Sequence, residues 1–184
     1  MSVVPGIPPQ PVDLTGVALA AGKGDPGATT AFVRATRAEV WRFVASLTSP
    51  ADADDLTQDT YLRAVRALPT FAARASARTW LLSIARRVCA DHLRSVVRQR
   101  RVQQRLAAAP PDGPVVDRSG LHAVADLVGG LAEDRRVAFV LTQVLGLSYA
   151  EAAEVASVPV GTVRSRVARA RADLVDAVRA ADAG

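Results

Sequence analysis

Residues 148–174 read SYAEAAEVASVPVGTVRSRVARARADL and contain the strongest structural signal in the chain. Their apolar spacing predicts a short helix over 149–156, a break at Ser157-Val158-Pro159 and a longer basic helix after the break. Ala153 is small enough to let the two helices cross closely. The stretch therefore predicts a helix-turn-helix, in which the second helix enters the major groove of DNA.

The second helix of this motif has an apolar side and a basic side. At about 100° per residue, Val167, Ala170 and Leu174 fall within roughly 40° of Val163, which defines a buried side. The opposite side has small residues, which let DNA approach, and arginines that reach base edges or phosphates. Its members are Ser165, Ala168, Arg169 and Ala172, with Arg164 and Arg171 along one flank and Arg166 along the other. The alternative interpretation is a solvated basic helix.

Outward from this motif, the chain predicts an all-α fold of two small helical domains joined by a flexible linker. No segment alternates with a period of two, so no strand is expected. Prolines concentrate in 1–13, which predicts a disordered tail, and again near 107–119. The expected domains are 14–100 and 120–184, with a linker over 101–119. Helices are expected at about 14–22, 26–47, 50–68, 79–105, 121–130 and 134–145, besides the two above.

Charge and composition narrow the class of protein. The net charge is +5, and residues 63–105 hold eleven arginines and a single acid. Such a basic block indicates a polyanionic partner, most often nucleic acid. One cysteine (Cys89) and two histidines exclude an internal disulfide and leave little for metal or histidine chemistry. We expect no cofactor and no metal. Without a membrane-spanning run or a secretory signal, the expected location is the cytoplasm.

An acidic helix precedes the basic block. Residues 52–64 read DADDLTQDTYLRA, and a helical wheel places Asp52, Asp55 and Asp59 on one stripe with Gln58 beside it. Leu56 and Leu62 are expected to pack inward. An exposed acidic stripe suits a basic partner helix. A capped, solvated amphipathic helix is the alternative.

The basic block itself begins with a small-residue loop. Residues 71–94 read FAARASARTWLLSIARRVCADHLR, and Leu81, Ile84, Ala85 and Val88 form one face of the helix. Trp80, Arg87 and Arg94 form a stripe on another face, with Arg98 near it. An aromatic ring beside arginines can stack on unpaired bases while the cations hold phosphates. Trp80 as an ordinary core residue is the alternative.

The C-terminal motif resembles region four of bacterial sigma factors, most closely in the extracytoplasmic-function (ECF) group. The similar segments are 146–153, 159–166 and 169–171. The resemblance implies a helix-turn-helix that reads the minus-thirty-five promoter element. The implied base or backbone contacts come from Arg164, Ser165 and Arg169, while Arg166 and Arg171 are implied to be phosphate-binding or structural. Ser157 stands where the family often has glycine, and Ala132 where it often has proline.

The N-terminal motifs resemble region two of the same family. Residues 52–64 are similar to the helix that docks on the clamp helices of RNA polymerase, which implies polymerase contacts from Asp52, Asp55, Gln58 and Asp59. Residues 71–94 are similar to the part that melts and reads the minus-ten element, with a loop over 71–78 that captures a flipped base. Its implied DNA contacts are Phe71, Arg74, Trp80, Ser83, Arg87 and Arg94. Arg87 and Arg74 depart from the commoner family residues, which leaves the recognised base open.

Together the two resemblances cover about 15–100 and 121–176 in family order. They imply an ECF sigma factor that binds core RNA polymerase, through its clamp helices and flap, and promoter DNA, and that is not itself an enzyme. Many members of the family are held by an anti-sigma factor, and the sequence leaves that partner open. The alternative is a conventional helix-turn-helix regulator with an N-terminal sensing or dimerisation domain. A nuclease is disfavoured, because no acid/base or metal constellation accompanies the basic surfaces.

Overall fold

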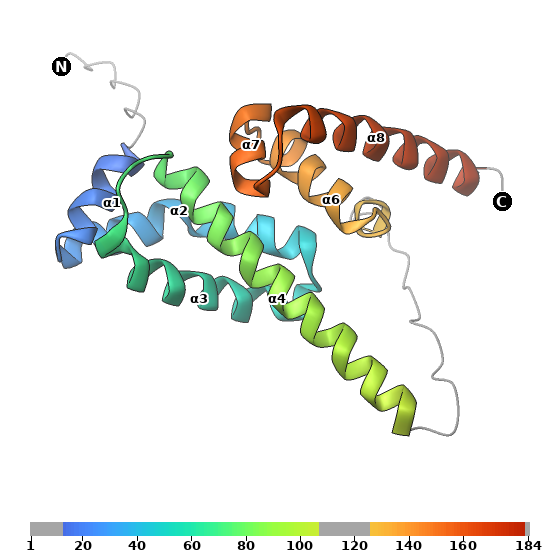
Figure 1. Ribbon diagram of the computed structural model, residues 1–184, viewed down its shortest axis with the longest axis horizontal. Helices are drawn as coiled ribbons and strands as arrows, with labels where there is room; N and C mark the ends of the chain where they lie inside the picture. The colour runs from blue at the N-terminus through green and yellow to red at the C-terminus, as the bar shows by residue number, and fades with distance from the viewer. Residues whose placement is uncertain (1–12, 107–125, 183–184) are drawn as a thin grey trace, which may run out of the picture.

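The computed structural model describes residues 13–106 and 126–182, and every regular element in these two ranges is helical. The all-α prediction is confirmed. All but the last residue of the expected tail falls outside the described residues. The same is true of residues 107–119 of the expected linker. The first domain contains α1 (Leu14–Gly22), α2 (Pro26–Leu47), α3 (Pro50–Ala67), the 3-10 turn η1 (Leu68–Thr70) and α4 (Ala77–Leu106). After a helical turn at 126–129, the second contains α6 (Glu133–Phe139), the π-helical turn η2 (Val140–Val144), α7 (Tyr149–Ala156) and α8 (Val160–Asp182) (Figure 1).

Side-chain caps start the helices of the first domain. The Asp25 carboxylate accepts from the backbone N–H of Ala28 at 3.0 Å, and Pro26 follows at the first position of α2. Ser49 and Pro50 repeat this arrangement at the start of α3, where the Ser49 hydroxyl accepts from the backbone N–H of Asp52. Proline is tolerated there because the first helical N–H has no intrahelical partner. The helix start expected at Ser49-Pro50 is confirmed.

The core of the first domain lies between α4 and the layer formed by α1, α2 and α3. Phe32 and Phe43 of α2 and Leu81 and Leu82 of α4 are fully buried in it. Cys89 is buried as well, and desolvation raises the pKa of its thiol to about 12, so the thiol stays protonated and acts as a small apolar side chain. These contacts fix α4 against the rest of the first domain.

The second domain contains the helix-turn-helix formed by α7 and α8. Val163, Val167 and Ala170 are buried, as the helical wheel predicted. The start of α7 is closed by a reciprocal capping box: the Ser148 hydroxyl accepts from the Glu151 backbone N–H, and the Glu151 carboxylate accepts from the Ser148 backbone N–H at 2.8 Å. The two helices are thereby held in a fixed pair, with one side of α8 inward and the other outward.

The two domains pack against each other, with α7 lying on α4 (Figure 1). Arg78 of α4 donates through Nε to the Glu39 carboxylate at 2.9 Å and through its terminal nitrogen to the Leu145 carbonyl at 2.6 Å. The Glu39 carboxylate raises the pKa of Arg78. In the opposite direction, Arg136 of α6 donates to the Leu47 carbonyl at the end of α2. The described part of the chain is therefore one packed unit, although the sequence predicted only two domains on a flexible linker.

Ser157 ends α7 in the left-handed region, with φ 55° and ψ 46°. We expect Ser157→Gly to stabilise the protein by about 0.5–1 kcal/mol. A residue with a Cβ is disfavoured in this backbone conformation by about 1–2 kcal/mol, and glycine removes that cost. Part of the gain is offset because glycine also has more conformational entropy in the unfolded chain. Urea unfolding measures the difference. Ser157→Ala keeps the Cβ and should show no such gain, so an alanine variant as stable as the glycine variant would contradict the argument.

Candidate nucleic-acid and polymerase interfaces

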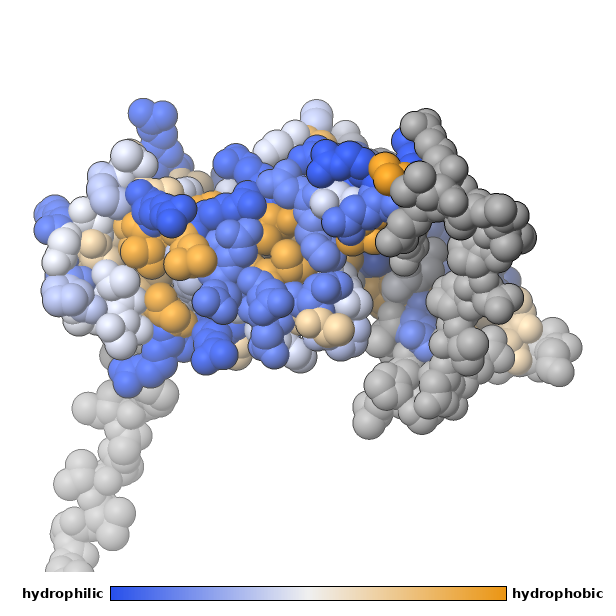
Figure 2. Space-filling model, turned by 90° about the horizontal axis from the view of Figure 1, so that it is seen from below, coloured by the Kyte–Doolittle hydropathy of each residue, from blue (hydrophilic) through white to orange (hydrophobic). Residues whose placement is uncertain are grey.

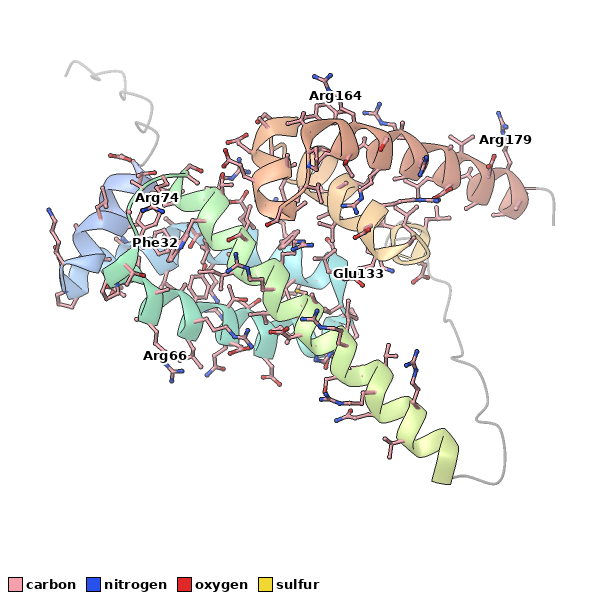
Figure 3. The ribbon with its side chains drawn as sticks, viewed as in Figure 1. Phe32, Arg66, Arg74, Glu133, Arg164 and Arg179 are labelled. Carbon is pink, nitrogen blue, oxygen red and sulfur yellow. The ribbon has the colours of Figure 1, made fainter. Side chains whose placement is uncertain are left out.

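The outer side of α8 carries the exposed polar residues of the helix-turn-helix. Arg164, Ser165 and Arg169 are all exposed there, and Arg164 projects away from the first domain (Figure 3). The Ser165 hydroxyl donates to the Thr162 carbonyl at 2.9 Å, so its oxygen keeps acceptor capacity toward solvent. The small Ala168 lies between these groups and adds no bulk that would hold a ligand away.

The two other arginines expected on this helix are engaged within the protein. Arg166 is half-buried and donates to the Asp134 carboxylate at 2.5 Å, and Arg171 donates to the side-chain oxygen of Gln143 at 2.7 Å. Both contacts tie α8 to the α6–η2 segment. Arg135 adds a third contact between these elements through its ion pair with Asp173. Helical periodicity alone does not predict this pair.

Arg164 is held differently. Its guanidinium carbon lies 5.9 Å from the centroid of the Tyr149 ring, the first residue of α7. At this distance a cation is attracted by the negative charge of the ring face. Both residues belong to the sequence motif, but the sequence did not indicate that they touch.

The loop before α4 encloses a hollow of about 280 Å³, smaller than most pockets for whole cofactors or drug-sized ligands, which span about 300–1,000 Å³. Its aromatic walls are Phe71 and Trp80, whose ring centroids lie 4.9 Å apart at 43°. Trp80 also lies 6.5 Å from Phe32 in the core. The ring therefore packs partly against the core and partly forms a wall of the hollow. The lining residues are Thr70, Phe71, Ala72, Arg74, Ala75 and Trp80.

Along α4, the polar residues expected on one stripe differ in their surroundings. Arg87 and Arg94 are exposed, whereas Ser83 is half-buried and donates to the Trp80 carbonyl at 2.7 Å. Arg94 pairs with Asp91 at 2.6 Å, and Asp91 also accepts from Arg63 of α3 at 2.9 Å. These two arginines, Arg63 first, lower the pKa of the Asp91 carboxyl. An anionic ligand must compete with Asp91 for Arg94.

The acidic surface of α3 is less uniform than the wheel suggested. Asp55 and Gln58 are exposed, Asp59 pairs with Arg63 at 2.9 Å, and Asp52 accepts from the Ser49 hydroxyl. The Asp52 carboxylate also lies 3.3 Å from His92 Nε2.

Next to this acidic surface lies an apolar surface that the sequence did not predict. Leu62 was expected to pack inward, but it is 51% exposed, and Val65 one turn further is 42% exposed. With Gln58, Tyr61 and Arg66 they line a shallow hollow. From the side of α3, apolar side chains are visible among hydrophilic ones (Figure 2). Leu56, expected inward with Leu62, does pack against the core.

Over residues 13–106 and 126–182, no three His, Cys, Asp or Glu side chains are grouped closely enough to hold a metal ion. No helix in the same residues is both long enough and apolar enough to cross a membrane.

Comparison with known proteins agrees with this geometry. The sequence pattern of sigma-70 region 2 matches residues 32–101, and that of sigma-70 region 4 matches 121–174. The ECF RNA polymerase sigma factor SigC of Mycobacterium tuberculosis is 52% identical over 163 residues, which cover 86% of this chain and 87% of SigC. The RNA polymerase sigma-H factor of Pseudomonas aeruginosa is 35% identical, over 65% of this chain and 69% of its own.

Solved structures give the same result. CnrH, in complex with the cytosolic domain of CnrY, superposes with a TM-score of 0.71 at 28% identity, over 91% of this chain and 97% of that chain. The sigma factor RpoE of Bartonella quintana, in complex with the anti-sigma factor NepR, gives 0.67 at 27% identity, over 80% and 94%.

Two helical domains with these patterns define a promoter-recognising initiation factor of bacterial RNA polymerase. The chain belongs to the sigma-70 family, within its extracytoplasmic-function group. The predicted family and function are confirmed. Sigma factors act by binding core RNA polymerase and promoter DNA. The roles of individual residues are a separate question.

Proposed function

We propose that this sigma factor initiates transcription through three surfaces: the acidic side of α3 for polymerase, the loop before α4 for the minus-ten element, and the outer side of α8 for the minus-thirty-five element. The observation that carries the proposal is the hollow walled by Phe71 and Trp80, with Arg74 at its edge. A hollow with aromatic walls beside a cation has the chemistry to receive one unstacked base. The proposed domains remain 14–100 and 120–184, on a linker over 101–119.

For polymerase binding, Asp55 and Gln58 are the exposed centre of the proposed contact, and Asp52 and Asp59 extend it along α3. A basic helix of the polymerase clamp is the partner that fits this charge. To bind that helix, Asp59 must give up its ion pair with Arg63. The free-energy cost is small because the pair is partly exposed to solvent. The second domain is proposed to bind the polymerase flap.

For the minus-ten element, Phe71, Arg74 and Trp80 are proposed to hold the flipped base. Ser83, Arg87 and Arg94 then follow the separated strand along α4. Arg87 is exposed and ready, while Arg94 is released from Asp91 when phosphate replaces the carboxylate.

For the minus-thirty-five element, Arg164, Ser165 and Arg169 are proposed to contact DNA, because they are exposed on the outward side of α8. Arg166 and Arg171 are proposed to hold α8 in place through their contacts with Asp134 and Gln143.

The proposal includes no catalytic step by this chain, since phosphodiester formation belongs to the polymerase. The site of action is then the cytoplasm, where polymerase and chromosome meet. CnrH and the Bartonella RpoE were solved with CnrY and NepR bound. By this likeness of fold, an anti-sigma protein is a further proposed partner.

Arg169→Ala tests the minus-thirty-five assignment. Loss of a base contact should reduce discrimination against substituted promoters by about 1–3 kcal/mol, whereas loss of a phosphate contact should weaken all promoters equally. Reconstituted polymerase holoenzyme, titrated against promoters with single substitutions, separates the two results. Arg179→Ala, an exposed arginine near the far end of α8, is the matched control and should change neither quantity. Unaltered affinity and specificity for Arg169→Ala would remove this residue from the interface.

A further inference from the structure

The contact between Tyr149 and Arg164 joins the two helices of the helix-turn-helix. Tyr149 is the first residue of α7, and Arg164 lies just over one turn into α8. The guanidinium carbon lies over the ring face, 5.9 Å from its centroid. Among the residues that the structure describes, no carboxylate forms an ion pair with Arg164, so the ring is the group that it lies against.

The ring itself is held firmly. Tyr149 is half-buried and packs against the hydrophobic core. The capping box between Ser148 and Glu151 fixes the backbone on both sides of it, with the Ser148 hydroxyl and Glu151 carboxylate 2.7 Å apart. A hydrogen bond from Ser148 to the Glu151 carboxylate also lowers the pKa of that carboxyl. Arg164 therefore rests on a rigid surface.

An arginine held by an aromatic ring keeps its N–H donors for a ligand, whereas an arginine held by hydrogen bonds has already used some of them. The terminal nitrogens of Arg166 and Arg171 already donate to Asp134 and Gln143, so a ligand must displace those acceptors. A guanidinium that lies against an aromatic face keeps its donors in its own plane, and none is consumed. Arg164 is thus restrained and exposed, and among the described residues none accepts a hydrogen bond from its guanidinium.

We propose that Tyr149 is a positioning residue for minus-thirty-five recognition. Its ring holds the Arg164 guanidinium so that two N–H groups meet a guanine edge in the major groove. A base edge is favoured because the N-terminal residues of a recognition helix are the ones that reach the bases, and a bidentate fork fits guanine O6 and N7. The inference rests on the proposed DNA contact of Arg164 and assigns the group that prepares it.

The test is a double-mutant cycle in reconstituted holoenzyme, read as the ratio of affinities for the cognate promoter and for promoters substituted at single minus-thirty-five positions. Tyr149→Leu should lower this ratio about two- to fivefold, the factor expected of an exposed cation–π contact. Tyr149→Phe keeps the ring and should retain the ratio. In the Arg164→Ala background, Tyr149→Leu should lower the ratio no further, because the ring acts through the arginine.

A second series guards against a folding defect in Tyr149→Leu. Phenylalanine analogues with increasing fluorination, incorporated at position 149, keep the ring shape but withdraw charge from its face. Discrimination should fall in step with fluorination while the melting temperature stays constant. A flat series overturns the proposal, as does a Tyr149→Leu defect that persists in Arg164→Ala, or a Tyr149→Phe variant as defective as Tyr149→Leu.

The same cycle separates the inference from the proposed function. If Arg164→Ala binds every promoter like the native protein, the proposed DNA contact of Arg164 is wrong and the positioning role fails with it. If it weakens all promoters equally, the contact is to phosphate and the positioning of Arg164 on a base edge is overturned. If Arg164→Ala is defective while Tyr149→Leu and the fluorinated series are normal, the DNA contact stands and the positioning role alone is overturned.

Discussion

Replacing Trp80 by alanine is expected to destabilise the first domain by about 3 kcal/mol, near the lower end for buried aromatics because the ring is only half-buried. The ring packs against Phe32 in the core and forms a wall of the hollow with Phe71. The variant should also fail to open promoters at temperatures where it remains folded, because stacking on one base contributes about 1–3 kcal/mol. Urea unfolding and open-complex formation measure the two losses separately.

Two control variants assign these losses. Trp80→Phe keeps an aromatic wall and should retain most of both properties. Arg87→Ala leaves the core intact, because the side chain is exposed, and should reduce opening without reducing stability. A premelted promoter bubble should rescue a melting defect but not a base-capture defect. If Trp80→Ala lowers stability and yet opens duplex promoters normally when folded, the hollow is not the base site and Trp80 is a core residue alone.

Reversing Asp55 and Asp59 to lysine is expected to weaken binding to core polymerase at least tenfold. Two favourable charge contacts become unfavourable ones at a complementary interface, where like charges in contact cost several kcal/mol. The protein should remain folded, because Asp55 is exposed, Asp59 is partly exposed, and the lost Asp59–Arg63 pair contributes little. Fluorescence anisotropy of the labelled protein against core polymerase measures the change, and circular dichroism checks the fold.

The matched control for net charge is Asp126→Lys with Asp176→Lys, which changes two exposed acids away from α3. Both lie in the second domain, for which a flap contact is proposed, so this variant should weaken polymerase binding by less than the α3 variant at the same ionic strength. An equal loss in the two variants would assign the effect to net charge. Equal affinity of the α3 variant and the native protein would place the polymerase contact elsewhere on the molecule, and the exposed Leu62–Val65 surface is the next candidate.

Much of the fold was readable from the sequence because its signals are local. Proline and a capping side chain mark the starts of α2 and α3, and the apolar spacing of Val163, Val167 and Ala170 identified the buried side of α8. Each of these signals acts within one helix, where a wheel angle determines which residues share a side.

What the sequence could not supply are contacts between elements. The ties of Arg78 to Leu145 and of Arg136 to Leu47 join residues far apart in the chain, and they depend on how α7 and α6 cross the first domain. The Tyr149–Arg164 contact likewise depends on the angle between α7 and α8. Leu62 was placed inward because apolar residues usually are, but in the described part of the chain its side chain is exposed to solvent. The periodicity of a helix shows which residues share a face, but it does not show which face another element packs against.

The most direct measurement is run-off transcription with purified core RNA polymerase on a promoter library. We expect core polymerase alone to start at none of these promoters specifically. Adding this chain should yield transcripts from a subset that shares minus-ten and minus-thirty-five elements. A chain that binds no core polymerase, or that binds an operator tightly as a dimer without it, would contradict the account.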